Sequence, residues 1–160
     1  MDVTAKIKDQ ITKVIGDACA VLEDKKVFKF EQGYLVPIEI EIPKDKKNGD
    51  FSSNIAMKIT KIVKKNPRET AELLLENFDL EDTYIDRCEI AGPGFINFYL
   101  KKDWMYDALK TVMKMGADYG RTDIGNGTKV VVEFVSANPT GPMHMGNARG
   151  GVIGDVLSNI

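Results

Sequence analysis

The sequence has little of what marks several large classes of protein. It holds one histidine and two cysteines, Cys19 and Cys88, which stand far apart and outside any CxxC spacing, so no zinc-binding module is predicted. We interpret both cysteines as reduced core residues, which favours a cytoplasmic protein. No long apolar run is present, so neither a signal peptide nor a membrane-spanning helix is expected.

The chain also lacks a net positive charge. Its 22 lysines and arginines are outnumbered by 24 acidic residues, which gives a formal charge of -2. Any contact with nucleic acid must therefore come from a local basic patch. Hydrophobic residues make up 43% of the 160 positions, which is enough to bury a core in one domain and part of a second.

Apolar residues at helical spacing predict four helices in the first part of the chain. They are expected over residues 3–22, 55–63, 67–78 and 104–115. Asn66 and Asp103 are expected to cap the last two of these helices, and Gly116 to end the fourth. The inner face of the fourth helix should carry Met105, Ala108, Leu109, Val112 and Met113.

Period-2 patterns predict three strands. Residues 36–42, with Pro37 and outward glutamates, are typical of an edge strand, whereas 84–91 and 94–100 form a hairpin through glycine and proline. We therefore predict a two-layer α+β domain over residues 1–120, with a mixed or antiparallel sheet and helices on one face. The last strand should turn Ile96, Phe98 and Leu100 to the helices, and Phe95, Asn97 and Tyr99 to the other face.

A second domain is expected to begin after a linker. Residues 118–128 carry three glycines, and the almost wholly apolar run Val130–Val135 that follows is typical of a strand covered on both faces in a parallel sheet. A helix is predicted from about Gly146 to Ile160. Residues 121–160 thus form one strand–loop–helix unit of a doubly wound sheet, which needs several more such units.

The segment 130–155 carries most of the chemistry. A buried strand, a polar loop, a lone histidine and a glycine-bearing helix start are the layout expected where a sheet holds a nucleotide against a helix N-terminus. Here His144–Asn147 resembles the HIGH signature of class I aminoacyl-tRNA synthetases, and residues 133–142 and 148–150 closely resemble the arginyl member of that class. Gly49–Ala56 and Ala91–Asn97 are similar to the additional N-terminal domain of that family.

The resemblance implies the first β-α unit of a Rossmann-type α/β catalytic domain and a set of arginine-binding residues. Glu133 falls where the family binds the substrate guanidinium, and Ser136, Asn138 and His144 fall around the amino and carboxyl groups. From the residues alone, Glu133 could instead pair with a cation of the same protein, and Ser136 and Asn138 could simply form a turn.

For ATP, the resemblance implies contacts from His144, Gly146 and Asn147, with His144 and Asn147 in the catalytic role. An imidazole N–H there would stabilise charge on the α-phosphate, although a lone histidine can equally be structural. Asn147 departs from the family, which usually has a second histidine at this position. Its amide keeps an N–H donor but never becomes cationic.

For tRNA, the resemblance implies that the additional domain contacts the D-loop corner. Phe95, Asn97 and Tyr99 offer two rings and an amide to an unstacked base, but they could also simply line the sheet. A second group could contact phosphates or be only a solvated helix face. Its members are Lys58, Lys61, Lys64, Lys65 and Arg68.

The expected function is ATP-dependent ligation of L-arginine to its tRNA through an arginyl-adenylate. ATP with Mg²⁺ is the expected substrate complex, with no tightly bound protein metal and no membrane partner, and the full-length enzyme is expected to be a monomer. The 160-residue chain alone should be inactive, because most of the nucleotide-binding sheet is missing. Two alternatives are a stand-alone RNA-binding module and a HIGH-type small-molecule nucleotidyltransferase, although the latter leaves residues 1–120 without a role.

Overall fold

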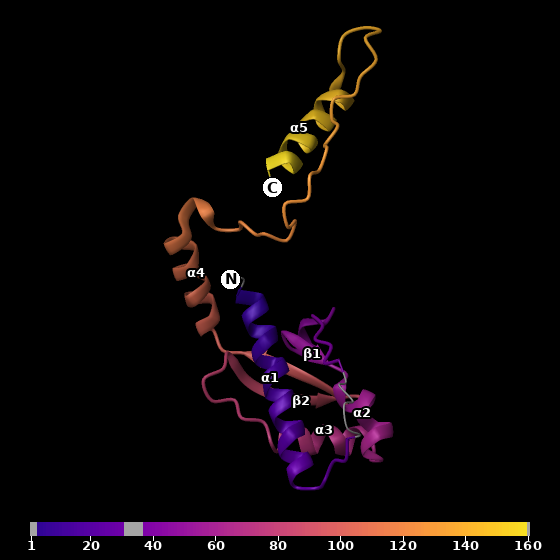
Figure 1. Cartoon of the computed structure of the whole chain (residues 1–160), viewed down its shortest axis with the longest axis vertical. Coiled ribbons are helices and arrows are strands. Elements are labelled where there is room, and N and C mark those ends of the chain that lie inside the picture. Colours follow the sequence, from indigo (N-terminus) through magenta and orange to yellow (C-terminus); the bar gives the residue numbers. More distant parts are fainter. Residues whose placement is uncertain (1–2, 31–36, 160) are drawn as a thin grey trace. The chain divides into compact units, whose positions relative to one another are not determined.

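The chain divides into two compact units, Met1–Tyr119 and Gly120–Ile160, and the computed structural model describes residues 3–30 and 37–159 (Figure 1). The first unit combines helices with a small antiparallel sheet. Its elements are α1 (Val3–Asp24), η1 (Lys46–Asn48), β1 (Phe51–Ser53), α2 (Ile55–Val63), α3 (Pro67–Leu75), β2 (Ile85–Ala91), β3 (Phe95–Leu100), α4 (Asp103–Met115) and η2 (Gly116–Asp118).

The sheet has three strands in the order β1-β3-β2, with antiparallel pairing throughout. The central strand β3 turns Ile96 and Phe98 into the core, where both are fully buried. The ring of Phe98 stacks against that of Phe78, 6.0 Å away between centroids. The predicted hairpin is confirmed, as is the predicted burial of Ile96 and Phe98 on the helix side of β3.

Helices α1, α2 and α3 form the layer that packs on the sheet, through the apolar stripes that the sequence predicts. α1 contributes Ile7, Ile11, Val14, Ile15, Ala18 and Leu22 to the core. The break between α2 and α3 is also as predicted, since the Asn66 side chain accepts a hydrogen bond from the Arg68 N–H at 2.9 Å and Pro67 occupies the first turn.

The predicted inner face of α4 is wrong. Met105, Leu109 and Met113 are 45%, 58% and 77% exposed, and no residue of this helix is fully buried. Lys102, rather than Asp103, occupies the N-cap position, while Gly116 does end the helix as predicted. An amphipathic pattern shows that a helix has an apolar face, but packing in the described chain decides which face is covered.

Polar contacts hold the opposite face of α4. The Tyr84 hydroxyl donates a hydrogen bond to the Asp107 carboxylate at 2.8 Å, and the Lys6 ammonium donates to the same hydroxyl at 3.0 Å. The hydrogen bond from Tyr84 lowers the pKa of Asp107. Trp104, one turn earlier, packs against the core.

The predicted strand over residues 36–42 is also wrong for the part that the structure describes, while Val36 lies outside the described residues. Glu41 makes only an isolated antiparallel bridge to Ser52, and the Ser53 hydroxyl donates to the Glu39 carbonyl oxygen at 2.7 Å. Because β1 is only three residues long, it offers few ladder positions for a neighbouring strand.

The two cysteines are free and pack against the core. Burial raises the pKa of Cys19 to about 11 and that of Cys88 to about 12. Both thiols are therefore protonated and poorly nucleophilic at neutral pH. Among the described helices, none combines the length and apolar character needed to cross a bilayer.

The second unit contains one helix, α5 (Met145–Asn159), where the sequence predicts it. The predicted strand Val130–Val135 is not formed, because a strand needs a hydrogen-bonded neighbour and the described residues of this unit supply none. Two glycines let the preceding chain pack on the helix. A Cβ at Gly154 would collide with Phe134, and one at Gly151 would lie 2.9 Å from the side chain of Val135.

Replacing the two glycines of the hairpin turn should have unequal effects. A Cβ at Gly94, where φ is 139°, would lie 2.9 Å from the Pro67 carbonyl oxygen, whereas nothing lies within 4 Å at Gly92, where φ is 53°. We expect Gly92→Ala to reduce the free energy of unfolding by about 1 kcal/mol and Gly94→Ala by about 3 kcal/mol or more. Urea unfolding followed by Trp104 fluorescence measures both losses, and equal losses would contradict the role of this contact.

Candidate functional site

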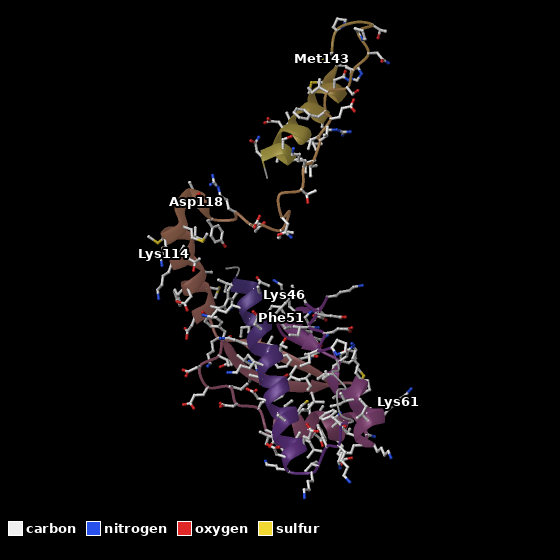
Figure 2. The ribbon with its side chains drawn as sticks, in the orientation of Figure 1. Lys46, Phe51, Lys61, Lys114, Asp118 and Met143 are labelled. Carbon is white, nitrogen blue, oxygen red and sulfur yellow. The ribbon has the colours of Figure 1, made fainter. Side chains whose placement is uncertain are left out.

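A polar cavity of about 330 Å³ opens in the loop that precedes α5. Its lining includes four residues that the sequence predicts for the site, namely Ser136, Asn138, His144 and Asn147. Most of this lining comes from the loop and only Asn147 from the helix, so the start of α5 forms one wall of the cavity. Met143, which also lines it, is labelled in Figure 2 at the turn before the helix.

His144 and Asn147 cap α5 reciprocally. The Gly146 N–H donates to Nδ1 of His144 at 3.1 Å, while the His144 backbone N–H donates to Oδ1 of Asn147 at 3.2 Å. This arrangement resembles a capping box, in which the N-cap side chain accepts a backbone N–H of the first turn and the side chain of the third helical residue accepts the N–H of the N-cap residue. The histidine ring is thereby fixed with Nδ1 as the acceptor, which leaves the proton of the neutral ring on Nε2.

The side chain of Asn147 is sufficient for the cap. An asparagine oxygen accepts the His144 N–H directly, and the same side chain keeps its two N–H donors on Nδ2. Local structure at the helix start therefore does not require a second histidine.

Two predicted residues lie apart from this cavity. Glu133 is exposed and is not among the residues that line it. Gly146 also lies outside the lining, and its contribution in the structure is the N–H that His144 accepts. In the described part of the chain, no group of three or more histidine, cysteine, aspartate or glutamate side chains is arranged to hold a metal ion.

The face of β3 that carries Phe95, Asn97 and Tyr99 is less exposed than the alternating sequence pattern predicts. Phe95 is 38% exposed, but Asn97 is only 4% exposed. The guanidinium of Arg87 lies over the Tyr99 ring, 3.8 Å from its centroid. The Tyr99 hydroxyl is within hydrogen-bonding distance of the Lys47 carbonyl oxygen, at 2.9 Å, and of Glu89, at 3.0 Å.

Of the three residues predicted on this face, Phe95 therefore presents the most open surface to a ligand. The sequence did not predict the contacts that Arg87 and Glu89 make with Tyr99. Arg87 and Glu89 come from the neighbouring strand, and only the strand register brings them beside the ring.

The predicted basic group separates into paired and unpaired members. Lys58 pairs with Glu39 and Lys65 with Glu69, each at 2.7 Å. Arg68 lies 3.5 Å from the carboxylate of a glutamate one turn further along its helix. Among the described ion pairs, none involves the remaining two members, Lys61 and Lys64.

Comparisons with known proteins identify the class. The family model described as the arginyl tRNA synthetase N terminal domain matches residues 4–100. An arginine–tRNA ligase of Acetivibrio thermocellus is 51% identical over 160 residues, and one of Carboxydothermus hydrogenoformans is 52% identical over 155 residues. The alignments cover 99% and 94% of this chain but only 28% and 27% of those relatives.

A solved structure supports the fold. The arginyl-tRNA synthetase of Plasmodium falciparum matches 93% of this chain and 27% of its own, with a TM-score of 0.59 at 21% identity. The protein class is thus that of the aminoacyl-tRNA synthetases. Within it, the chain belongs to the arginyl-tRNA synthetase family.

Two substitutions at His144 should test whether its side chain caps α5. We expect His144→Ala to fray the first turn of α5 and to reduce its stability by about 1 kcal/mol, while His144→Asn keeps the cap because asparagine is a good N-cap residue. Amide hydrogen exchange of residues 145–148, measured by NMR, reports the fraying. If His144→Asn frays the helix as much as His144→Ala, the side chain is not acting as a cap.

Proposed function

We propose that this protein ligates L-arginine to its cognate tRNA at the expense of ATP. The carboxylate of arginine attacks the α-phosphorus, and pyrophosphate leaves with the bonding electron pair. A hydroxyl of the terminal ribose of tRNA then attacks the carbonyl carbon of the arginyl-adenylate, so that an ester forms and AMP leaves. The reciprocal cap that holds His144 and Asn147 at the wall of a polar cavity is the observation that carries the proposal. The sequence identity of 51% to an arginine–tRNA ligase, over 99% of this chain, supports it.

The capped helix start suits the charge that develops in the first step. With Nδ1 occupied by the Gly146 N–H, the imidazole presents Nε2 as its donor, and Nδ2 of Asn147 is a second donor on the same turn. Both lie at the N-terminal, electropositive end of α5, where phosphate oxygens are favoured. In this role His144 stabilises the transition state without having to remove a proton.

Arginine would be held by the loop and by the segment before it. We assign the α-amino and carboxyl groups to Ser136 and Asn138, which line the cavity with His144, and the guanidinium to Glu133, whose carboxylate is exposed. A carboxylate can accept two parallel hydrogen bonds from a guanidinium, which distinguishes arginine from lysine.

The two units would divide the work. Residues 1–120 would contact the tRNA, and residues 121–160 would supply the first unit of a Rossmann-type nucleotide-binding domain, with ATP entering as its Mg²⁺ complex. The chain spans about 28% of the length of the relative from Acetivibrio thermocellus. We therefore expect the 160-residue chain alone to show no ATP–pyrophosphate exchange. The family match over residues 4–100 gives the first unit a role that a small-molecule nucleotidyltransferase would not need.

A chimera tests the assignment. In it, this chain replaces the matching 28% of the Acetivibrio thermocellus relative, and arginine-dependent ATP–pyrophosphate exchange and tRNA charging are measured. We expect activity in the chimera, and we expect His144→Ala to lower kcat about 10²–10³-fold, the range for loss of a donor to a developing negative charge.

A matched pair of carboxylate variants then tests arginine binding. Glu133→Gln should raise the KM for arginine about tenfold or more, as loss of a charged hydrogen bond predicts, and leave the KM for ATP unchanged. Asp155→Asn, at an exposed carboxylate on α5, should change neither. A folded chimera without arginine-dependent exchange would refute the proposed function.

A further inference from the structure

A groove that the function above does not use lies where the chain leaves α1 and passes the end of α2. Its volume is about 640 Å³, and its lining is Val27, Lys29, Phe30, Lys61, Ile62, Val63 and Lys64. Three of the seven lining residues are thus lysines, and the other four are apolar. Lys61 is exposed on the outward side of α2 (Figure 2).

The three groove lysines differ from the other cations nearby. Lys58 and Lys65, on or beside the same helix, are each held by a glutamate at 2.7 Å. Among the ion pairs of residues 3–30 and 37–159, none involves Lys29, Lys61 or Lys64. Three like charges around one groove produce a positive potential that an anionic partner would neutralise.

The backbone at Lys64 supplies an independent observation. Lys64 ends α2 in the left-handed conformation, with φ 53°, and its N–H donates to the Thr60 carbonyl oxygen at 2.9 Å. Glycine is the usual residue at such a helix end, and a side chain there costs roughly 1 kcal/mol. Lys64 therefore occupies a position where glycine would be the more stable residue.

The position of the groove indicates the kind of anion. The hairpin turn touches the start of α3, because a Cβ at Gly94 would lie 2.9 Å from the Pro67 carbonyl oxygen. The backbone of Phe95, the exposed residue after Gly94, is therefore close to the start of α3, which begins three residues after Lys64. A strand of RNA offers both groups that such a surface would contact, a base for the ring and phosphates for the lysines.

We propose that the groove of Lys29, Lys61 and Lys64 binds the phosphodiester backbone of an RNA strand, next to the nucleotide that contacts Phe95. The proposal rests on the proposed function and deepens it, because the RNA would be the tRNA substrate. Lysines act here as point charges on phosphate oxygens, so the contact contributes affinity and register rather than base specificity.

Charge removal in the groove tests this in the 160-residue chain with an arginine tRNA transcript. We expect Lys61→Gln with Lys64→Gln to weaken binding about tenfold near 0.1 M salt and to reduce the slope of log K against log salt by about 1.4–1.8, the value for two lost phosphate contacts. The matched control is Lys58→Gln with Lys65→Gln, which removes two ion-paired lysines and should change the affinity less than about twofold.

Lys64→Gly separates binding from folding. Glycine suits the left-handed helix end, so this variant should keep or raise the melting temperature while weakening tRNA binding about threefold. A Lys64→Gly protein that is as stable as the parent and binds equally well would overturn a role for this charge.

The remaining outcomes distinguish the two proposals. If the parent chain binds the transcript and the groove variants bind it equally well with the same salt slope, the groove proposal fails while the proposed function stands. If the parent chain does not bind the transcript at all, the groove proposal fails, and the exchange and charging activity of the chimera then decides the proposed function by itself. If poly-glutamate binds more tightly than the transcript and loses affinity in the groove variants, the groove is a site for an acidic protein and the RNA proposal is overturned.

Discussion

The hairpin turn between β2 and β3 packs closely against the first turn of α3, and this contact positions β3 in the first unit. At Gly94 the backbone adopts φ 139° directly against the Pro67 carbonyl oxygen, a conformation and a spacing that only glycine accommodates. A second glycine acts at the other end of β3, where a Cβ at Gly49 would lie 2.7 Å from the Phe98 carbonyl oxygen. Larger residues at either position would push β3 away from its neighbours, and in the observed arrangement Phe95 is exposed while Ile96 and Phe98 fill the core.

Glycines also permit close packing within the second unit. Gly151 and Gly154 lie on one side of α5 and let Val135 and Phe134 pack against the helix, while His144 and Asn147 complete the helix start. The segment that leads to the helix and the residues that cap it thus belong to one local structure. In the proposed function, a phosphate would meet a helix start that is already ordered before it binds.

Much of this fold could be predicted because its signals are local. Helix α1, the Asn66–Pro67 break, the hairpin and the helix stop at Gly116 each follow from residues within a few positions of one another. The errors concern partners distant in sequence. Tyr84, which accepts a hydrogen bond from Lys6, bonds to the polar side of α4, so the apolar side of this helix is exposed. Within residues 3–30 and 37–159, the apolar run at 130–135 has no neighbouring strand to pair with.

The candidate sites divide in the same way. The loop and helix start around His144 were predicted by resemblance, and the structure places Ser136, Asn138, His144 and Asn147 around one cavity. Sequence patterns could not show that Lys58 is ion-paired while Lys61 and Lys64 share a groove with Lys29, because Glu39 and Lys29 come from other segments. The pair of Lys65 and Glu69 is different, because its members are four residues apart and their spacing alone could have predicted it.

The most direct test of the account is hydrogen–deuterium exchange of the chain with and without an arginine tRNA transcript, read peptide by peptide. Protection concentrated at the end of α2 and around the hairpin turn, including residues 61–64 and 94–96, is the result that the account predicts. Protection confined to the exposed apolar face of α4, with residues 61–64 and 94–96 exchanging as in the free chain, would contradict it.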